Sequence, residues 1–431
     1  MTIAPDRDIT DTADALTVEL PSGASFPVRI APHAFATADD AVVVDSAARL
    51  DVLRRLDEYP HVRALLDPTC LDAAIARRAQ VRDWLTDGAY VFGAYKVGLK
   101  IARQVLAAGV AVRGFIDNDP AKHGTRVAGI PVGLPGSVDL AGRTVLVMSG
   151  RHGIAIKRQL EALGDVRIVN MPELQYALNL PHGADADFAD FVHAPRREVF
   201  RYLAAFARLD DERSRQVFDH LIGMRTTLSI DLAEAVKSPF DDEYFDAEFV
   251  TAEQAARFAD AGAAAGDTLV RLERHFGPVE QAWLFEPELP PYYEALRTFA
   301  DRPEVYVFNM GLDAAPSRAV YAPGLSYDIA GEMTSAVPLD ITSYIQGVEL
   351  DAVVPGRVGL FKLDIEGMEQ RALHGARGVI HRDRPTIAVC AYHRNDDYWR
   401  LIDEVLAVRP DYRVGIRLYS DILEDITLYF Y

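Results

Sequence analysis

The chain has 431 residues, 49% of them hydrophobic and 25% charged, a balance typical of a globular protein with substantial hydrophobic cores. This length exceeds one ordinary domain and fits two or three. The formal net charge of −19 argues against nucleic acid as a partner, because phosphate contacts need a basic surface. Arg77-Arg78 and Arg196-Arg197 are only pairs and form no basic block.

The sequence shows no pattern of export or of membrane insertion. No apolar run approaches the roughly 18 to 20 residues of a membrane span. Met1 to Thr12 is polar and acidic, without the basic and apolar regions of a secretory signal. The two cysteines, Cys70 and Cys390, cannot form a disulfide framework and are expected to be reduced thiols. We therefore expect a cytoplasmic protein without membrane partners, and the Arg- and Ala-rich composition favours a bacterial source.

Residues 1–84 are expected to form an N-terminal appendage. Residues 15–20 and 25–30 flank a Pro-Ser-Gly turn and predict a β-hairpin. Apolar spacing predicts helices over residues 45–56 and 71–85. This part of the chain contains no catalytic motif, so we assign it a packing role.

Residues 85–180 have the pattern of a Rossmann-like domain. A strand at 89–92 leads into a glycine turn from Gly93 to Gly98, and a helix and a second strand ending at Asp117 follow. The predicted strands are 89–92, 110–116 and 144–148, and the predicted helices are 99–108 and 154–163. Tyr95 occupies the place of the second glycine of G-x-G, where a side chain obstructs the pyrophosphate of a dinucleotide.

This segment resembles the Rossmann-like domain found ahead of sugar acyltransferases and some methyltransferases. The matching residues are Phe92-Gly93, Gly98, Gly114 to Pro120, Lys122, Gly124 and Gly129 to Val132. The resemblance implies the fold and leaves two roles open. In the first, the domain is structural or recognises a substrate, and in the second it binds a nucleotide.

Residues 181–240 predict a helical connector, and residues 241–431 a second and larger α/β domain. Apolar spacing predicts connector helices over 198–209 and 212–224. In the second domain we expect strands at 257–260, 281–286, 305–309, 359–363, 386–392 and 425–431, and helices at 268–276 and 290–300. The predicted fold class is α/β, with two doubly wound Rossmann-like domains joined by a helical connector.

Two features of the second domain indicate a cofactor with an adenosine part. Asp260 to Thr268 follows a strand and opens a helix, and its glycines permit a close approach of the backbone to a ligand. Glu286 closes the next strand, where an acid can accept both ribose hydroxyls. The turn lacks the G-x-x-x-x-G-K-[ST] pattern, which excludes ATP binding by a P-loop.

A third feature is the acidic turn that follows the apolar run Val358 to Leu363. Asp364 and Glu366 are two residues apart, so both carboxylates point to one face of an extended backbone. Ligands of open α/β sheets bind at the carboxyl ends of the strands. This turn therefore predicts an active site.

The second domain resembles the FkbM family of S-adenosylmethionine-dependent methyltransferases. Its first motif resembles Phe258 to Thr268, and its ribose motif resembles Phe285-Glu286-Pro287. The family signature K-x-D-x-E-G-x-E-x-x-x-L-x-G-A matches Lys362, Asp364, Glu366, Gly367, Glu369, Leu373, Gly375 and Ala376. A further subfamily pattern fits Tyr392-His393, Asp397-Tyr398-Trp399, Tyr412, Arg417 and Tyr419. Glu288 departs from the family, in which Asp or Asn is usual after Glu-Pro.

The resemblance implies S-adenosylmethionine as the cofactor and assigns roles to individual residues. The implied cofactor-binding residues are Asp260, Gly262, Gly266, Asp267, Thr268, Glu286, Asn309 and Met310. The first three would hold the amino-acid part, and Asp267-Thr268 would present helix N–H groups to its carboxylate. Glu286 would accept the ribose, and Asn309 or Met310 would flank the adenine. Thr268 can also serve as a helix cap.

The expected catalytic residues are Asp364, Glu366, His393 and Lys362. Methyl transfer to an alcohol needs a base within hydrogen-bond reach, and a histidine has a suitable pKa. The carboxylates would hold His393 in one tautomer, bind sugar hydroxyls, or ligate a divalent metal through Asp364 and Glu366.

Several of these residues also have a structural interpretation. Lys362 can simply neutralise the acids, Glu366 can cap the next helix, and His393 can be a core histidine. Glu369 and Arg371 are expected on a solvated helix face. Asp340 matches a family position but fits a turn equally well.

The predicted function is O-methylation of a hydroxyl on a sugar or glycosylated metabolite. The alternatives are an NAD-dependent oxidoreductase working through residues 85–180 and a binding protein that has lost activity. The expected partner is a small-molecule or carbohydrate acceptor, and assembly into a homo-oligomer stays open.

Overall fold

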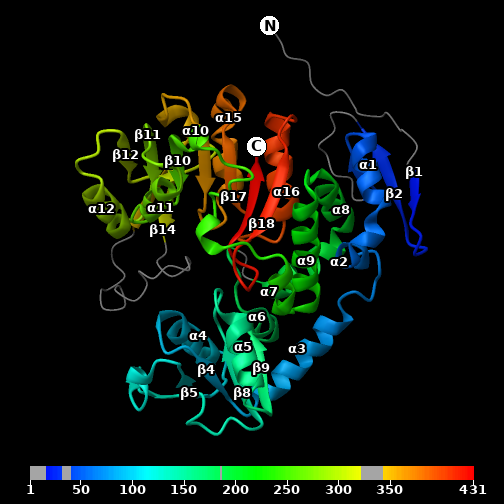
Figure 1. Ribbon diagram of the computed structural model, residues 1–431, viewed down its shortest axis with the longest axis vertical. Helices are drawn as coiled ribbons and strands as arrows, with labels where there is room; N and C mark the ends of the chain where they lie inside the picture. The colour runs from blue at the N-terminus through cyan, green and yellow to red at the C-terminus, as the bar shows by residue number, and fades with distance from the viewer. Residues whose placement is uncertain (1–15, 32–39, 185–186, 322–342) are drawn as a thin grey trace.

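The computed structural model describes residues 16–31, 40–184, 187–321 and 343–431. Figure 1 shows the first Rossmann-like sheet in the lower part of the molecule, the second in the upper part, and green connector helices beside both. Asp340 lies outside the described residues. No helix in the described ranges combines the length and the apolar character that a membrane crossing requires.

The N-terminal segment forms the predicted hairpin and packs on the connector. β1 (Leu16–Glu19) pairs antiparallel with β2 (Ser25–Ile30), and β3 (Val42–Val44) adds in parallel. The helices that follow are α1 (Ala47–Arg54), α2 (Pro60–Ala64) and α3 (Asp72–Leu85). The sheet and these helices contact connector helices, so one side of the segment packs on the connector.

The first sheet has the order β6-β7-β5-β4-β8-β9, parallel except for β6. Its strands are β4 (Ala89–Phe92), β5 (Val112–Ile116), β6 (Arg126–Val127), β7 (Ile130–Gly133), β8 (Arg143–Val147) and β9 (Val166–Asn170). Its helices are α4 (Lys96–Ala107), α5 (Gly153–Glu161) and α6 (Met171–Leu178). Helix α4 begins three residues before the predicted start, so the glycine turn is shorter than expected.

The connector forms three helices and two 3₁₀ turns. They are α7 (Phe188–Arg197), α8 (Val199–Arg208), α9 (Glu212–Thr227), η3 (Ile230–Ala235) and η4 (Phe240–Asp242). Most residues of α8 are buried, because it contacts β3 and α1 and also α16 of the second domain. The connector is therefore a packed layer between the other parts of the chain.

Seven of the described strands form the second sheet, in the order β12-β11-β10-β16-β17-β19-β18. Its strands are β10 (Arg257–Ala261), β11 (Gln281–Phe285), β12 (Val305–Phe308), β16 (Leu360–Leu363), β17 (Thr386–Cys390), β18 (Val414–Leu418) and β19 (Ile426–Phe430). The first five are parallel, and β19 is antiparallel to β17 and β18. The residues of β16 and β17 are buried throughout, as expected for central strands with both faces covered.

Helices and a small second layer complete this domain. The helices are α10 (Ala252–Ala255), α11 (Asp267–Phe276), α12 (Leu289–Thr298), α13 (Leu350–Val353), α14 (Glu369–His374), α15 (Arg377–Asp383) and α16 (Asp397–Val408). A small sheet contains β13 (Gly311–Leu312), β15 (Ser343–Val348) and β14 (Ser317–Tyr321). The molecule is thus α/β, with two doubly wound sheets joined by helices. The boundaries at residues 84, 180 and 240 stay predictions.

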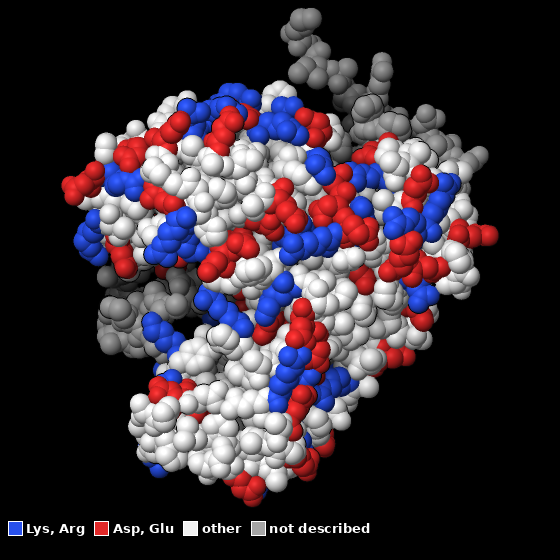
Figure 2. Space-filling model, viewed as in Figure 1, with Lys and Arg blue, Asp and Glu red and all other residues white. Residues whose placement is uncertain are grey.

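Acidic and basic side chains are interspersed on the face shown in Figure 2, with no continuous basic surface there.

Candidate active site

Each doubly wound sheet has a switch point, where the strand order reverses and ligands of such folds bind. In the second sheet the order runs from β10 to β12 on one side and from β16 onward on the other. The second switch point therefore lies at the carboxyl ends of β10 and β16. At this place a Cβ on Gly262 would lie 1.9 Å from the carbonyl oxygen of Asp364, so only glycine fits.

Lys362 holds the glycine turn in place through hydrogen bonds to its backbone. Its Nζ donates to the carbonyl oxygens of Gly262 (2.7 Å) and Ala261 (3.2 Å) and lies 2.9 Å from Oδ1 of Asp260. Lys362 is opposite Asp260 in the β10–β16 register, so strand pairing creates the ion pair. The exposed fractions of the two side chains are 2% and 0%.

This burial assigns both residues a different role from the one expected. Lys362 was predicted to be catalytic and Asp260 to contact the cofactor, but each is enclosed and directed at the other. Burial raises the pKa of Asp260 to about 6 in spite of the lysine. The pair therefore acts as a positioning element for the glycine turn.

Glu286 lies directly after β11, beside the same turn. Its Oε2 accepts a hydrogen bond from the N–H of Ala264 (2.9 Å), and its Oε1 accepts one from Glu288 (2.7 Å). The side chain is buried, which raises the pKa of Glu286 to about 7. No cation among the described residues forms an ion pair with it. Each oxygen keeps a further lone pair, so the carboxylate can accept hydroxyl groups of a ligand.

The remaining predicted cofactor residues surround this turn. Gly266 has a φ of +85° and precedes α11, whose first residues are the exposed Asp267 and the buried Thr268. Nδ2 of Asn309 donates to the carbonyl oxygens of Glu286 (3.1 Å) and Pro287 (2.9 Å). Asn309 and Met310, which follows it, are partly exposed beyond β12. All eight residues predicted to bind the cofactor thus lie at the carboxyl ends of β10, β11 and β12.

Three carboxylates, from Asp364, Glu366 and Glu369, converge on His393, which is 2% exposed. Its Nδ1 lies 3.0 Å from Oε1 of Glu369. Its Nε2 lies 3.6 Å from Oδ1 of Asp364 and 3.7 Å from Oε2 of Glu366. One carboxylate therefore lies at one ring nitrogen and two at the other. The structure brings together three of the four predicted catalytic residues, with Glu369 as an addition.

The carboxylates change the charge of His393. Burial alone would lower the pKa of His393, but Glu369, Asp364 and Glu366 raise it to about 10. Burial would likewise raise the pKa of Asp364, but Lys362 and His393 hold it below its ordinary value. At neutral pH the ring is thus a cation between carboxylates. The expectation that His393 is the general base does not fit this site.

The burial of Glu369 corrects a second expectation. It was placed on a solvated helix face, but its side chain is 1% exposed, whereas Arg371 is 55% exposed. Oε1 of Glu369 accepts hydrogen bonds from the N–H groups of Ile365 (2.9 Å) and Gly367 (3.3 Å). The helix-face prediction was wrong because α14 spans only six residues, and its first turn folds back under the acidic turn.

Glu366 itself occupies the left-handed region, with a φ of +56°. Its side chain is 47% exposed, compared with 29% for Asp364. Asp364 is held by the hydroxyl groups of Tyr244 (3.1 Å) and Tyr392 (3.5 Å). Among these carboxylates, Glu366 is therefore the most accessible to a ligand.

A small cavity of about 90 Å³ opens beside His393. Its lining residues are His182, Gly183, Glu366, Tyr392, His393 and Glu424. Our reading of the sequence missed His182 and Glu424. The sequence signal for His182 was the glycine that follows it. Gly183 has a φ of +53°, and a Cβ there would lie 2.4 Å from the carbonyl oxygen of His393, so this position requires glycine. Ala184 N also donates to that oxygen (2.8 Å).

The donor set for a metal ion differs from the predicted one. Within the described ranges, the His, Cys, Asp and Glu side chains close enough to share an ion are Asp364, Glu369 and His393, without Glu366. Oε1 of Glu369 already accepts two backbone N–H groups, and His393 is held as a cation. A metal at this place would need His393 as a neutral imidazole, with Asp364 and Glu369 as the carboxylate ligands.

The first switch point, between β4 and β8, is filled by the protein. The Tyr95 ring lies over the turn, so a Cβ on Gly93 would lie 2.3 Å from it, and the Tyr95 hydroxyl donates to the carbonyl oxygen of Met148 (3.3 Å). The loop after β18 covers the neighbouring edge. Asp421 N donates to the Gly150 carbonyl (2.6 Å), and Asp421 Oδ2 accepts from Ile154 N in the first turn of α5 (3.1 Å).

In the first domain the acid after the second strand, Asp117, already has partners within the protein. Oδ2 of Asp117 accepts the N–H of Ala94 (2.7 Å) and lies 2.9 Å from Nζ of Lys122. Burial alone would raise the pKa of Asp117, but hydrogen bonds and Lys122 hold it below its ordinary value. The Tyr95 and Lys122 side chains thus take the two positions that a dinucleotide would need.

Comparison with known proteins gives a similarity at the level of the fold. No family model matches the sequence, and no curated protein matches it. The crystal structure of methyltransferase FkbM from Methylobacillus flagellatus KT matches with a TM-score of 0.64 and 22% sequence identity. The match covers 86% of this chain and 100% of that chain. At this identity the similarity establishes a shared fold, over most of both chains.

Proposed function

We propose that the chain is an S-adenosylmethionine-dependent methyltransferase. The observation that carries the proposal is the second switch point. There the glycine turn, the close approach of Gly262 to Asp364, and the buried Glu286 without a cation lie together. The shared fold with an FkbM methyltransferase supports it. The acceptor we propose is a hydroxyl of a sugar or of a glycosylated metabolite, because the neighbouring groups are carboxylates that accept hydrogen bonds from hydroxyls.

The residues of the turn would hold the cofactor. Glu286 would accept the two ribose hydroxyls, since its carboxylate has no competing cation. The N–H groups at the start of α11 would receive the carboxylate of the methionine part. Asn309 and Met310 would border the adenine. When bound, S-adenosylmethionine supplies a methyl group on a positively charged sulfur.

Glu366 is the residue best placed to take the proton of the acceptor. Bound S-adenosylmethionine would supply the methyl group that the acceptor oxygen takes, and the acceptor hydroxyl would have to lose its proton. The hydroxyl proton passes to a carboxylate oxygen of Glu366, which is 47% exposed and lines the small cavity. A positioned base of this kind contributes about 10²–10⁴-fold. Asp364, which two tyrosines hold, would orient the acceptor.

His393 would keep these carboxylates in place. Its positive charge offsets the repulsion between Asp364 and Glu366, and Glu369 orients the ring from the other side. We assign no step to a metal ion.

The two alternatives fit less well. An NAD-dependent oxidoreductase would need the first switch point, where Tyr95 fills the turn and Lys122 pairs with Asp117. A binding protein that has lost activity would not need a buried Glu369 to orient His393 toward the cavity.

The experiment that tests the proposal is a calorimetric titration with S-adenosylhomocysteine. We expect binding by the wild type and at least a tenfold weaker affinity in Glu286→Gln, since the amide cannot accept at both positions. The matched control is Asp117→Asn, the equivalent acid of the first domain, which should bind as the wild type does. Absence of binding by the wild type, or equal losses in the two variants, would contradict the cofactor assignment.

The acceptor class is tested separately, with cofactor labelled in the methyl group and a panel of monosaccharides and glycosides. Transfer to a carbohydrate is expected, and its loss in Glu366→Gln would support the base. Transfer to amines alone would contradict the hydroxyl assignment.

A further inference from the structure

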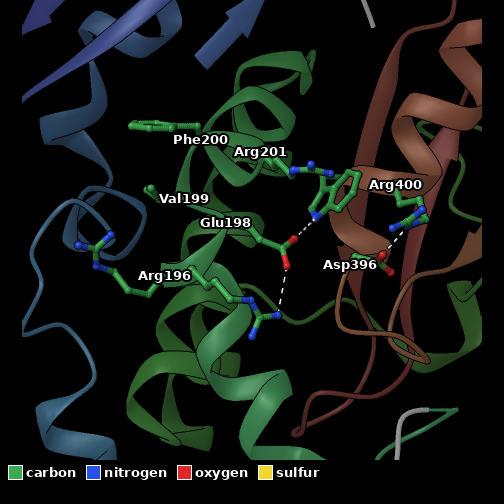
Figure 3. Close-up of a pocket in the computed structure, with 9 residues that line it drawn as sticks. Arg196, Glu198, Val199, Phe200, Arg201, Asp396 and Arg400 are labelled. Carbon is green, nitrogen blue, oxygen red and sulfur yellow. Dashed lines mark hydrogen bonds and ion pairs between the residues drawn. The ribbon is translucent and has the colours of Figure 1, made fainter. Parts of the chain in front are cut away.

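A second and larger cavity lies away from the switch points, between the connector and the start of α16 (Figure 3). Its volume is about 590 Å³, within the range of small-molecule sites. Its lining residues are Arg196, Arg197, Glu198, Val199, Phe200, Arg201, Asp396, Trp399 and Arg400. It shares no residue with the small cavity beside His393.

The charge of this cavity is opposite to that of the molecule. Four arginines line it against two carboxylates, Glu198 and Asp396, in a chain with a net charge of −19. Three of the arginines come from the connector and Arg400 comes from α16. The sequence showed only the pair Arg196-Arg197, because the fold is needed to bring Arg400 beside it.

Contacts within the protein hold several of these groups in place. The guanidinium carbons of Arg201 and Arg400 lie 4.4 Å and 4.9 Å from the centre of the Trp399 ring. The Trp399 Nε1 donates to Glu198 (3.0 Å), which also pairs with Arg197 (3.1 Å), as the dashed lines in Figure 3 show. These guanidinium groups are therefore preorganised, which lowers the entropic cost of binding a ligand.

Arg196 differs from the other three. In the part of the chain that the structure describes, no hydrogen bond or ion pair reaches its guanidinium group. The helices α8 and α16 also begin at the cavity, with no side-chain cap at either N-cap residue. Uncapped helix starts add to the positive potential that the arginines create.

We infer that this cavity binds a small molecule through a phosphate or diphosphate group. Guanidinium groups bind phosphate oxygens in bidentate geometry, and a doubly charged group matches the excess of two positive charges. The Trp399 ring already carries two guanidinium groups, so the anionic group rather than an aromatic ring would anchor the ligand. This inference goes beyond the proposed methyl transfer and does not depend on it.

Calorimetry with inorganic phosphate and inorganic pyrophosphate, at constant ionic strength, tests the inference. We expect saturable binding of one pyrophosphate per chain and weaker binding of phosphate. In the double variant Arg196→Gln/Arg400→Gln the affinity should fall at least tenfold. The control is Arg297→Gln on α12, which removes one exposed charge elsewhere and should leave the affinity unchanged.

Two further measurements keep the test decisive. Arg201→Lys keeps the charge but loses the bidentate geometry, so it should bind pyrophosphate more weakly even if the double variant unfolds. Succinate presents two carboxylates instead of phosphate and should bind at least tenfold more weakly. The inference is overturned if pyrophosphate does not saturate, if Arg297→Gln loses as much affinity as the double variant, or if succinate binds equally well.

Discussion

The two doubly wound sheets carry the same arrangement at their switch points, but only the second leaves it open. In each domain an acid after the second strand accepts an N–H from the glycine turn: Asp117 from Ala94, and Glu286 from Ala264. In the first domain Lys122 neutralises the acid and Tyr95 covers the turn. In the second domain the residues of the turn are small, and none of the described cations pairs with Glu286.

This difference shows that a doubly wound sheet alone does not define a ligand site. The pKa values of the two acids reflect this difference between the domains. The pKa of Asp117 is lowered, whereas burial raises the pKa of Glu286 to about 7. We therefore expect the Rossmann pattern of the first domain to serve packing and that of the second to bind a cofactor. Four predictions test this contrast.

The largest effect is expected from the buried ion pair of the second domain. Lys362→Met would leave Asp260 buried without a partner and should lower the free energy of unfolding by about 3–5 kcal/mol. Lys157 of the first domain pairs with Asp231, which is 53% exposed, so Lys157→Met should cost below about 1 kcal/mol. Urea unfolding measures the free energy of unfolding of both variants. Similar decreases in the two variants would show that the Lys362–Asp260 pair does not support the turn.

The next effect concerns the orientation of His393. Glu369→Gln should lower kcat about 10²-fold with the best carbohydrate acceptor, and the pKa of His393 measured by NMR should fall because a neighbouring negative charge is removed. Glu404→Gln is a matched control, since Glu404 lies 3.3 Å from the exposed His374. A loss of kcat without a change in the pKa of His393 would indicate only a packing role.

A smaller effect is expected on the pH dependence of stability. The pKa of His393 is raised from 6.5 to about 10, so its stabilising charge is fully present below pH 6.5 and is lost as the pH rises through about 10. From pH 7 to 10.5 the free energy of unfolding should therefore fall more steeply in the wild type than in His393→Asn. His374→Asn should follow the wild type, and a slope for His393→Asn equal to that of the wild type would refute the raised pKa.

The smallest effect is expected from the first switch point. Tyr95→Ala should leave methyl transfer within about threefold of the wild type, because the side chain is 43% exposed and lies outside the second domain. The wild type should show no binding of NADH by fluorescence. If NADH binds to the wild type, the first domain is a nucleotide site after all.

Much of the fold could be predicted from the sequence because it follows from local patterns. The strands at 89–92, 257–260, 281–286 and 359–363 are found within one residue of the predicted bounds. Contacts between distant segments could not be predicted. The Asp260–Lys362 pair requires the β10–β16 register, and the burial of Glu369 requires the fold around a short helix. The arginine cavity likewise joins residues from the connector and from α16.

The contact between Ala184 and His393 limits how the protein can be divided. Ala184 follows the first domain, and its N–H donates to the carbonyl oxygen of His393, the residue that the carboxylates surround. A side chain at the position of Gly183 would collide with the same carbonyl. A polypeptide starting at residue 241 would keep the whole second sheet yet lose this support. We therefore expect that the second domain does not fold as an independent module, and that exchanging it between related chains would require residues 181–184 as well.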